Sequence, residues 1–345
     1  MIKKLFLILP LIVLIAILGY GNYVYNQFTL PLKIQEPTLY TVENGSSVRK
    51  VLSDFEQKGW MTQSRAAELY LRYLEKTAIQ RGDYELTSGL TPMAAIEKMI
   101  EGKKVLSTIS FIEGHRFSEL LKTLASHSDI KQTLTGLAVE EIVAKVSSDI
   151  KHPEGWFFPD TYHFEKGTTD LHILKTAYQR TKNVLAQEWE NRSDKAAVKT
   201  PYDALILASI IEKETGAAFE RPMISGVFTR RLKKGMRLQT DPTVIYGLGD
   251  NFSGNLTRTH LRTDTPYNTY TRKGLPPTPI ASAGREAIFA ALNPSDGTTL
   301  FFVAKGDGTH YFSTTLEEHN SAVRQYQRFG RREDYQSAPS TEDSK

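Results

Sequence analysis

The sequence of 345 residues contains no cysteine. This absence excludes disulfide bonds, a thiol nucleophile and thiolate metal ligands, and it is compatible with an oxidising or exposed compartment. The eight histidines show neither an HExxH motif nor paired spacing of the zinc-finger kind, so the sequence predicts no metal site. Phosphate-loop and GxSxG motifs are also missing, and we expect no cofactor.

The sequence also has little net charge. Its 43 Lys and Arg residues exceed its 39 Asp and Glu residues by only four. An excess this small is compatible with contact to an anionic wall or lipid, but it gives no support for a nucleic-acid partner. The densest basic cluster, residues 230–234, lies in the expected last turn of a helix, where cations complement the helix dipole.

The N-terminus carries the longest uncharged run, from Leu5 to Leu32, behind Lys3 and Lys4. Residues 5–25 are about as long as a bilayer-spanning helix needs to be, and no A-x-A-like cleavage site follows them. We therefore expect residues 1–4 in the cytoplasm, an uncleaved single-pass transmembrane anchor at 5–25, and the remainder outside the cytoplasm. A cleaved signal peptide is the alternative.

The rest of the chain predicts an α+β fold with two regions. An accessory region, 37–150, alternates short strands and helices, with expected helices at 48–58, 64–77, 91–101 and 118–125 and expected strands at 39–42 and 105–112. A second region, 151–331, has expected helices at 171–191, from Pro201 to a stop at Gly216, and at 221–234, 285–292 and 316–329. Strands at 300–304 and 309–313 flank a hairpin turn, and the polar tail 333–345 is expected to be disordered.

The segment from Ser209 to Gly249 is the most informative part of the chain. It includes the end of a helix for which Thr200 is the expected N-cap and Pro201 the first residue. Glu214 continues the apolar face of that helix, together with Leu207, Ile210 and Ile211. Glu212 is rotated from Glu214 by roughly 200°, so the two carboxyl groups do not easily enter one cleft.

Two interpretations of Glu214 follow from this position. Apolar neighbours and a helix C-terminus both disfavour an anion, so we expect its pKa to be raised, as a general acid requires. Alternatively, Glu214 is an ordinary amphipathic-helix residue paired with Lys213 or a distant arginine. Periodicity by itself leaves both open.

Several motifs resemble the endolytic murein transglycosylase (MltG, or YceG-like) family. They are the IIEKE helix end at 210–214, MRLQTDPTVIYG at 236–247, EGWFFPDTY at 154–162, PYNTY at 266–270 and GLPP at 274–277. The resemblance covers most of residues 40–330, and the twelve-residue run at 236–247 is very specific. The helix end also resembles the I-x-x-E-[ST] frame of other lytic transglycosylases, which Glu214 and Thr215 match and Glu212 does not.

The resemblance implies a membrane-bound lyase of bacterial cell wall biogenesis. Such an enzyme cleaves the MurNAc–GlcNAc bond of nascent peptidoglycan strands, leaves 1,6-anhydro-MurNAc ends and limits glycan chain length. The implied place is the inner (plasma) membrane with the catalytic domain in the periplasm, beside peptidoglycan synthases. Region 37–150 is similar to a LysM-like module, which implies glycan contact, although a simple spacer remains open.

The resemblance also implies site residues. Glu214 is the implied catalytic residue, with Glu212 as a secondary candidate. Substrate-binding roles are expected for Gln239, Thr240, Asp241, Tyr246, Asn268 and Tyr270.

Two alternatives stay open. One is a lysozyme-like hydrolase with Asp241 as second carboxylate, and the other is a non-enzymatic wall-binding scaffold. Against the first, Asp241 precedes Pro242, where we expect its carboxylate to cap the amides of the next helix.

Overall fold

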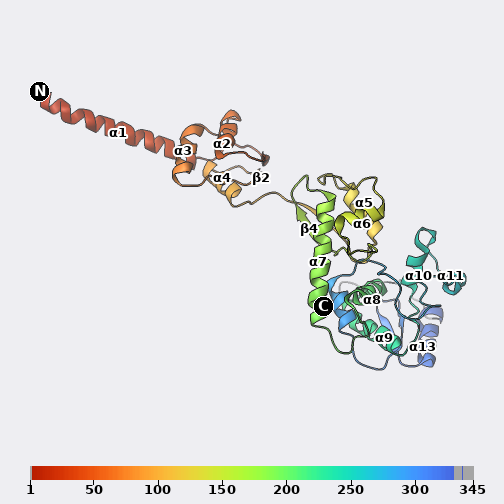
Figure 1. The fold of residues 1–345 in the computed structure, drawn as a ribbon. Coiled ribbons are helices and arrows are strands. Elements are labelled where there is room, and N and C mark those ends of the chain that lie inside the picture. Colours follow the sequence, from red (N-terminus) through yellow and green to blue (C-terminus); the bar gives the residue numbers. More distant parts are fainter. Residues whose placement is uncertain (1, 330–335, 337–345) are drawn as a thin grey trace. The chain divides into compact units, whose positions relative to one another are not determined.

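The protein is a mixed α+β molecule, as expected. The computed structural model describes residues 2–329 and 336, with the backbone alone for residues 2–10, 24 and 27. Within these residues, each sheet has two strands (Figure 1). The chain divides into unit 1, Met1–Thr108 with His163–Gly167, and unit 2, Ile109–Tyr162 with Thr168–Lys345. The expected tail, 333–345, lies outside the described residues apart from Gln336, as does Met1 of the expected cytoplasmic segment.

Unit 1 is a small sheet with helices packed on it. Its elements are α1 (Ile2–Thr29), β1 (Thr38–Val42), α2 (Val48–Gln57), α3 (Ser64–Tyr73), β2 (Gly82–Leu86) and α4 (Pro92–Ile100). β1 and β2 pair antiparallel, with Thr38 opposite Leu86. Thr91 caps α4 as expected, because its hydroxyl accepts the Ala94 N–H at 3.1 Å. The core of the unit is formed by fully buried side chains that include Leu52, Phe55, Tyr84, Ile96 and Met99.

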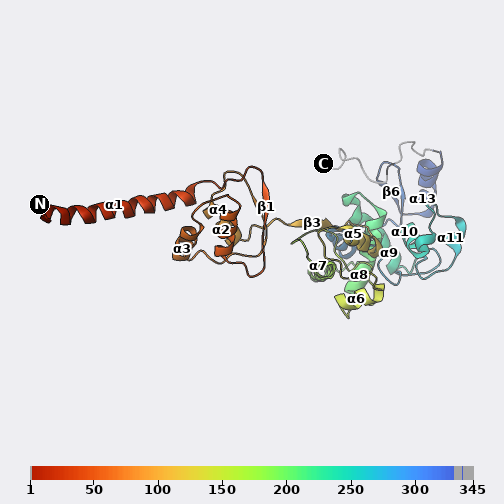
Figure 2. The same ribbon diagram turned by 90° about the horizontal axis from the view of Figure 1, so that it is seen from above.

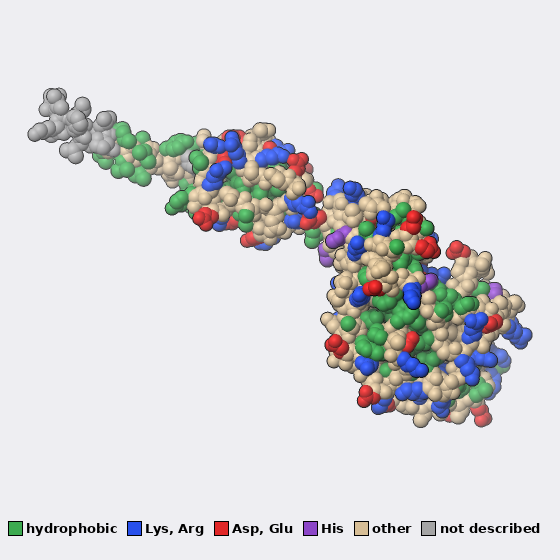
Figure 3. All heavy atoms as spheres, in the orientation of Figure 1, with side chains coloured by type: hydrophobic (Ala, Val, Ile, Leu, Met, Phe, Trp, Pro, Cys, Tyr) green, Lys and Arg blue, Asp and Glu red, His purple; other side chains and the backbone are tan. Residues whose placement is uncertain are grey.

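Helix α1 covers the segment predicted to be the membrane anchor. Among the described residues, no helix combines the length and the apolarity needed to cross a bilayer, so the anchor remains a prediction. Apolar side chains along the described part of α1, such as Leu14 and Ile17, are exposed (Figure 3). The end of α1 and the residues just after it are not exposed in this way. Phe28 and Leu32 are buried in the core of unit 1, and the Leu32 N–H bonds to the Leu90 carbonyl.

Unit 2 is mainly helical (Figures 1 and 2). Its elements include α5 (Phe117–Ser126), α6 (Val139–Val146), α7 (Asp170–Glu190), α8 (Pro201–Glu214), η1 (Ala218–Glu220), α9 (Arg221–Lys233), α10 (Asp241–Leu248), η2 (Gly249–Asn251), α11 (Arg258–Arg262), α12 (Arg285–Leu292), β5 (Phe301–Ala304), β6 (His310–Ser313), α13 (Leu316–Val323) and η3 (Arg324–Phe329). The predicted hairpin is confirmed, since β5 and β6 pair antiparallel with Phe301 opposite Ser313. The boundary between the units falls inside β3 (Ser107–Ser110) and β4 (Thr161–Phe164), which pair with each other.

Residues 109–150 belong to unit 2 by packing, whereas the sequence pattern grouped them with the accessory region. Phe117 of α5 stacks on Phe157 with ring centroids 4.8 Å apart, and α6 packs against α7. These contacts join α5 and α6 to the part of the chain that carries Glu214.

Helix α8 is the central element of unit 2. It packs against α7, α9, α10 and α12, and its residues Ala204 to Ile211 are all buried. Fully burying an aliphatic side chain contributes roughly 1.5–3 kcal/mol, so this helix is firmly held. Its start is as predicted: the Thr200 hydroxyl accepts the Asp203 N–H, and the Asp203 carboxylate accepts the Thr200 N–H. It ends at Glu214, where Thr215 becomes extended, two residues before the glycine expected to stop it.

Candidate active site

Glu214 is the last residue of α8 and is partly buried. Loss of hydration raises the pKa of its carboxyl group to about 7, and the nearby charge of Asp241 adds to that rise. The hydrogen bond from Thr240 and the charges of His310 and Arg231 oppose it. The carboxyl group is therefore half protonated near neutral pH, which suits a group that must both give and take a proton.

Thr240 fixes one oxygen of this carboxyl group. Its hydroxyl donates to Glu214 Oε1, and the Thr240 side chain is only 2% exposed. The Thr240 N–H donates to Thr269 Oγ1 at 3.1 Å, and the Thr243 hydroxyl donates to the Thr240 carbonyl at 2.8 Å. Because this threonine cluster is buried and mutually bonded, it holds Glu214 Oε1 in place and leaves Oε2 as the oxygen available to carry the acidic proton.

Asp241 is the first residue of α10 and lies next to this cluster. Its Oδ1 accepts the Tyr270 hydroxyl at 2.6 Å. The capping role expected for Asp241 is therefore not what the structure shows: Thr240 occupies the N-cap position, and the carboxylate turns toward Tyr270. Burial, and then the bond to Asp241, raises the pKa of Tyr270, so this phenol stays protonated and donates.

Gln239 immediately precedes Thr240, and its backbone is strained. Its φ is +56°, in the left-handed region that non-glycine residues rarely adopt. Its N–H bonds to the Thr269 carbonyl at 3.2 Å, and its side-chain oxygen lies 3.5 Å from Arg231 Nη1. Arg231 also donates to the carbonyls of Leu238 at 2.7 Å and Leu300 at 2.6 Å, so this buried guanidinium ties the segment before Thr240 to β5.

A second network holds the chain just after Glu214. The buried Glu220 accepts the backbone N–H of His310 at 2.8 Å, and its other oxygen lies 2.7 Å from His310 Nδ1. The Thr215 hydroxyl donates to the same Glu220 oxygen at 3.4 Å and accepts the Ala217 N–H at 2.9 Å. This network joins the β5–β6 hairpin to the end of α8.

Glu212 faces different partners from Glu214. Its Oε1 lies 3.1 Å from Arg221 Nη2, and its Oε2 accepts the Gly284 N–H at 2.9 Å. The side chain is 5% exposed. Glu212 thus connects α8 with α9 and the start of α12, away from the threonine cluster.

Two of the expected substrate-binding residues form their side-chain hydrogen bonds with groups other than Glu214. Asn268 is 1% exposed, and its amide donates to the carbonyls of Thr263, His260 and Leu261, which makes it a support of its own loop. Tyr246 donates to Glu154 Oε2 at 3.1 Å. Burial raises the pKa of Glu154 to about 7, and its Oε1 accepts the Phe117 N–H at 2.9 Å.

The structure thus brings together Glu214, Thr240, Asp241, Tyr270 and the backbone of Gln239. Sequence patterns missed His310, which reaches the end of α8 from a distant part of the chain, and Glu220, which is near in sequence but whose bonds to His310 and Thr215 depend on the fold. They also missed the support that Glu154 gives to Tyr246 and Phe117. The sequence pattern predicted that Arg231 complements the helix dipole. In the structure Arg231 is buried and donates to the carbonyls of Leu238 and Leu300. In the described part of the chain, no three acidic or histidine side chains gather in a way that could hold a metal ion.

Most of this chain matches a known protein family. Residues 40–325 match the YceG-like family. The chain belongs to this family. A Bacillus subtilis (strain 168) protein named endolytic murein transglycosylase is 32% identical over 326 residues, covering 89% of this chain and 90% of that protein. A protein of the same name from Streptococcus pneumoniae serotype 2 is 26% identical, and the match covers 92% of this chain and 65% of the pneumococcal protein.

The family likeness extends to a solved structure. A crystal structure of a yceG-like protein from Listeria monocytogenes aligns with a TM-score of 0.53 at 33% identity, covering 84% of this chain and 99% of the other. The chain therefore shares fold as well as sequence with the family.

Proposed function

We propose that this protein is an endolytic murein transglycosylase, a lyase that cleaves the glycan strands of peptidoglycan. The named relatives support the activity. The observation that carries the chemistry is the partly buried carboxyl group of Glu214, whose pKa is raised to about 7 and whose Oε1 accepts the Thr240 hydroxyl. A single carboxyl group with this pKa can act first as an acid and then as a base.

The proposed reaction uses Glu214 twice. Its Oε2 proton passes to the glycosidic oxygen between MurNAc and GlcNAc, and the bond from C1 of MurNAc to that oxygen breaks. The carboxylate then takes the proton of the 6-hydroxyl of the same MurNAc as that oxygen closes on C1. The products are a 1,6-anhydro-MurNAc end and a free GlcNAc hydroxyl, no water is consumed, and Glu214 is again protonated.

The neighbouring residues have matching roles in this proposal. Thr240 orients the acid, and the Asp241–Tyr270 pair presents a negative charge and a phenol at the edge of the site. A negative charge there would stabilise positive charge developing on the sugar ring. Gln239 holds the backbone before Thr240 through its bond to the Thr269 carbonyl. Tyr246 bonds to Glu154, and Asn268 supports the loop at 260–270.

Mass spectrometry of digested peptidoglycan tests the reaction. Anhydro ends are expected for the wild type and none for Glu214→Gln. Reducing ends would point to a hydrolase with Asp241 as second carboxylate, and no cleavage by the wild type would point to a wall-binding scaffold.

We also propose that α1 anchors the protein in the bacterial inner membrane with unit 2 outside the cytoplasm. The uncharged run behind Lys3 and Lys4 supports this arrangement. Cleavage near the membrane, beside the peptidoglycan synthases, would limit the length of nascent strands.

A further inference from the structure

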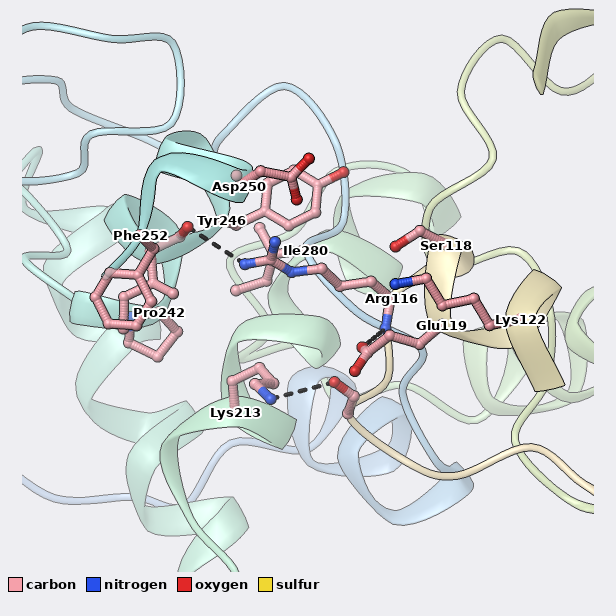
Figure 4. A pocket seen from close by; sticks show the side chains of 13 residues that line it. Arg116, Ser118, Glu119, Lys122, Lys213, Pro242, Tyr246, Asp250, Phe252 and Ile280 are labelled. Atoms are coloured by element: carbon pink, nitrogen blue, oxygen red, sulfur yellow. Dashed lines mark hydrogen bonds between the residues drawn. The ribbon is translucent and has the colours of Figure 1, made fainter. Parts of the chain in front are cut away.

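A cleft of about 600 Å³ lies between the start of α5 and the α10–η2 segment. Arg116 and Lys122 line it from the α5 side, Lys213 from the end of α8, and Pro242, Tyr246 and Phe252 from the opposite side (Figure 4). We call it the basic cleft. All of its lining residues belong to unit 2.

Within the described part of the chain, none of the three cations of the basic cleft forms an ion pair, although burial raises the pKa of the nearby Glu154 and the charge of Arg116 opposes that rise. Arg116 lies with its guanidinium 5.1 Å from the centre of the Tyr246 ring and donates to the Ile245 carbonyl at 3.3 Å. Lys213 donates to the Gly114 carbonyl at 3.2 Å, and Lys122 is exposed. Since a guanidinium has five N–H donors and an ammonium three, these groups keep donors for a ligand.

The basic cleft adjoins the Glu214 site through two shared elements. Lys213 immediately precedes Glu214 at the end of α8, and Pro242 immediately follows Asp241 at the start of α10. Glu214 and Asp241 do not themselves line the cleft, but these neighbours in the chain place it within reach of another part of the same substrate molecule.

The peptidoglycan substrate carries an anionic group next to the bond that is cleaved. Each MurNAc carries, through the lactyl ether on C3, a short peptide that ends in carboxylates. In the proposed reaction C1 of the same ring is attacked, so the peptide must leave the site within a few atoms of Glu214. A cleft beside Glu214 that bears unpaired cations fits this peptide.

We propose that the basic cleft binds the anionic peptide of the muramoyl residue that is cleaved, an inference that rests on the proposed function. The lining favours a peptide over a diphosphate. Glu119 and Asp250 also line the cleft, together with the apolar surfaces of Pro242, Phe252 and Ile280. Carboxylates would repel a dense diphosphate, whereas a peptide brings amides and apolar side chains as well as carboxylates. The Glu119 carboxylate accepts the Arg116 backbone N–H at 2.8 Å, and within the described part of the chain it forms no ion pair with Lys122 or Lys213.

The test compares two substrates with the full-length protein. One is glycan with its peptides, and the other is the same glycan after amidase has removed them. The measured quantity is the ratio of kcat/KM for the two. We expect the wild type to favour the peptide-bearing glycan, and Lys122→Gln and Lys213→Gln each to lower the ratio by about three- to tenfold, with a larger loss in the double variant. Lys233→Gln, on α9 outside the cleft, is the matched control and should leave the ratio unchanged.

The outcomes separate this inference from the proposed function. Cleavage of both substrates with the same ratio in wild type and double variant would overturn the peptide site and leave the transglycosylase proposal standing. If the wild type cleaves neither substrate, the proposed function itself fails. A binding measurement adds a second arm: inactive Glu214→Gln should bind a muramoyl peptide, and tighter binding of inorganic pyrophosphate would assign the cleft to a diphosphate and contradict the proposal.

Discussion

At the scale of single residues, two glutamates two positions apart have different surroundings. Glu214 accepts the Thr240 hydroxyl, and its pKa is raised. Glu212 pairs with Arg221 and accepts the Gly284 N–H. Glu214→Gln keeps the size of the side chain and removes its titratable proton. We expect cleavage to fall by about 10⁴ or more, because general acid catalysis is worth on the order of 10²–10⁴ and one residue serves both proton transfers. Turnover of purified peptidoglycan, with circular dichroism as the check on folding, measures this.

Glu212→Gln is the matched control for that variant. It leaves Arg221 without one of its charged partners, so we expect stability to fall by about 1–3 kcal/mol while turnover below the melting temperature stays within a few-fold of wild type. An inactive, folded Glu212→Gln together with an active Glu214→Gln would reverse the assignment.

Asp241 gives a prediction about pH. Its charge raises the pKa of Glu214, so Asp241→Asn should lower that pKa and move the alkaline limb of the pH–rate profile to lower pH. Activity would fall at both pH values because the charge that stabilises the sugar cation is lost, and it would fall several-fold more near pH 7.5 than near pH 5.5, where Glu214 remains protonated. Asp296→Asn, which removes a surface charge paired with Lys195, should leave the profile in place. Complete loss of turnover at every pH in a folded Asp241→Asn protein would instead favour Asp241 as nucleophile or base, and an alkaline limb that does not move would contradict the electrostatic effect on Glu214.

Helical periodicity predicted the face of Glu214, because that property depends only on local geometry. It did not predict Asp241's partner. The choice between capping the next helix and accepting from Tyr270 depends on a loop that returns 29 residues later, and local sequence carries no signal of that approach.

At the scale of elements, the β5–β6 hairpin supports the end of α8 through Glu220. Glu220→Gln should weaken its bonds to His310 and Thr215 and loosen the backbone beside Glu214. Because small displacements of a reacting group are costly, we expect kcat to fall about ten- to hundredfold with little change in KM. Glu318→Gln is a suitable control, since it removes a capping interaction at the exposed start of α13. An equal loss in both variants, or a rise in KM with unchanged kcat, would contradict the positioning role.

Most helices with clear caps and periodicity were predicted within a few residues. The expected helix 285–292 has the bounds of α12, and the helix expected from Pro201 to a stop at Gly216 is α8, which ends at Glu214. Helix α11 was missed because it has only five residues, and α6 was missed because Ala138 at its N-cap gives no capping signal. The expected helix 316–329 is α-helical only to Val323 before it becomes η3. The grouping of 109–150 with unit 2 could not be predicted, since it depends on the Phe117–Phe157 stack and on the packing of α6 against α7.

At the scale of the whole molecule, buried carboxyl groups make stability depend on pH. The pKa of Glu154 is raised to about 7, so the folded state binds more protons than the unfolded state between about pH 4.5 and 7. Its contribution to stability is therefore complete below the unfolded pKa and is lost as pH rises through about 7. The loss is about 2–3 kcal/mol by pH 8. Denaturant unfolding of Glu154→Gln should show a flatter decline from pH 5 to 8 than wild type, and an identical decline would contradict this assignment.

Buried residues at and just after the end of α1 limit how far the chain can be shortened before unit 1 loses stability. Deleting residues 1–22 removes most of the exposed apolar helix but keeps Phe28 and Leu32, which are 4% and 3% exposed in the core of unit 1. Deleting residues 1–32 removes both, and each large buried side chain is worth about 2–5 kcal/mol. We expect the shorter deletion to keep the melting temperature of unit 1 and the longer one to lower it. Both should still cleave purified peptidoglycan, because Glu214 and its partners lie in unit 2.

In cells the same two truncations test the anchor. A protein secreted without α1 should restore glycan length poorly at normal expression, because the tether holds the enzyme at a high effective concentration where new strands emerge. Replacing α1 with an unrelated transmembrane helix should restore function, since the tether supplies only location. Full rescue by the secreted form lacking residues 1–22, at wild-type abundance, would show that the tether is dispensable and would refute this part of the proposal.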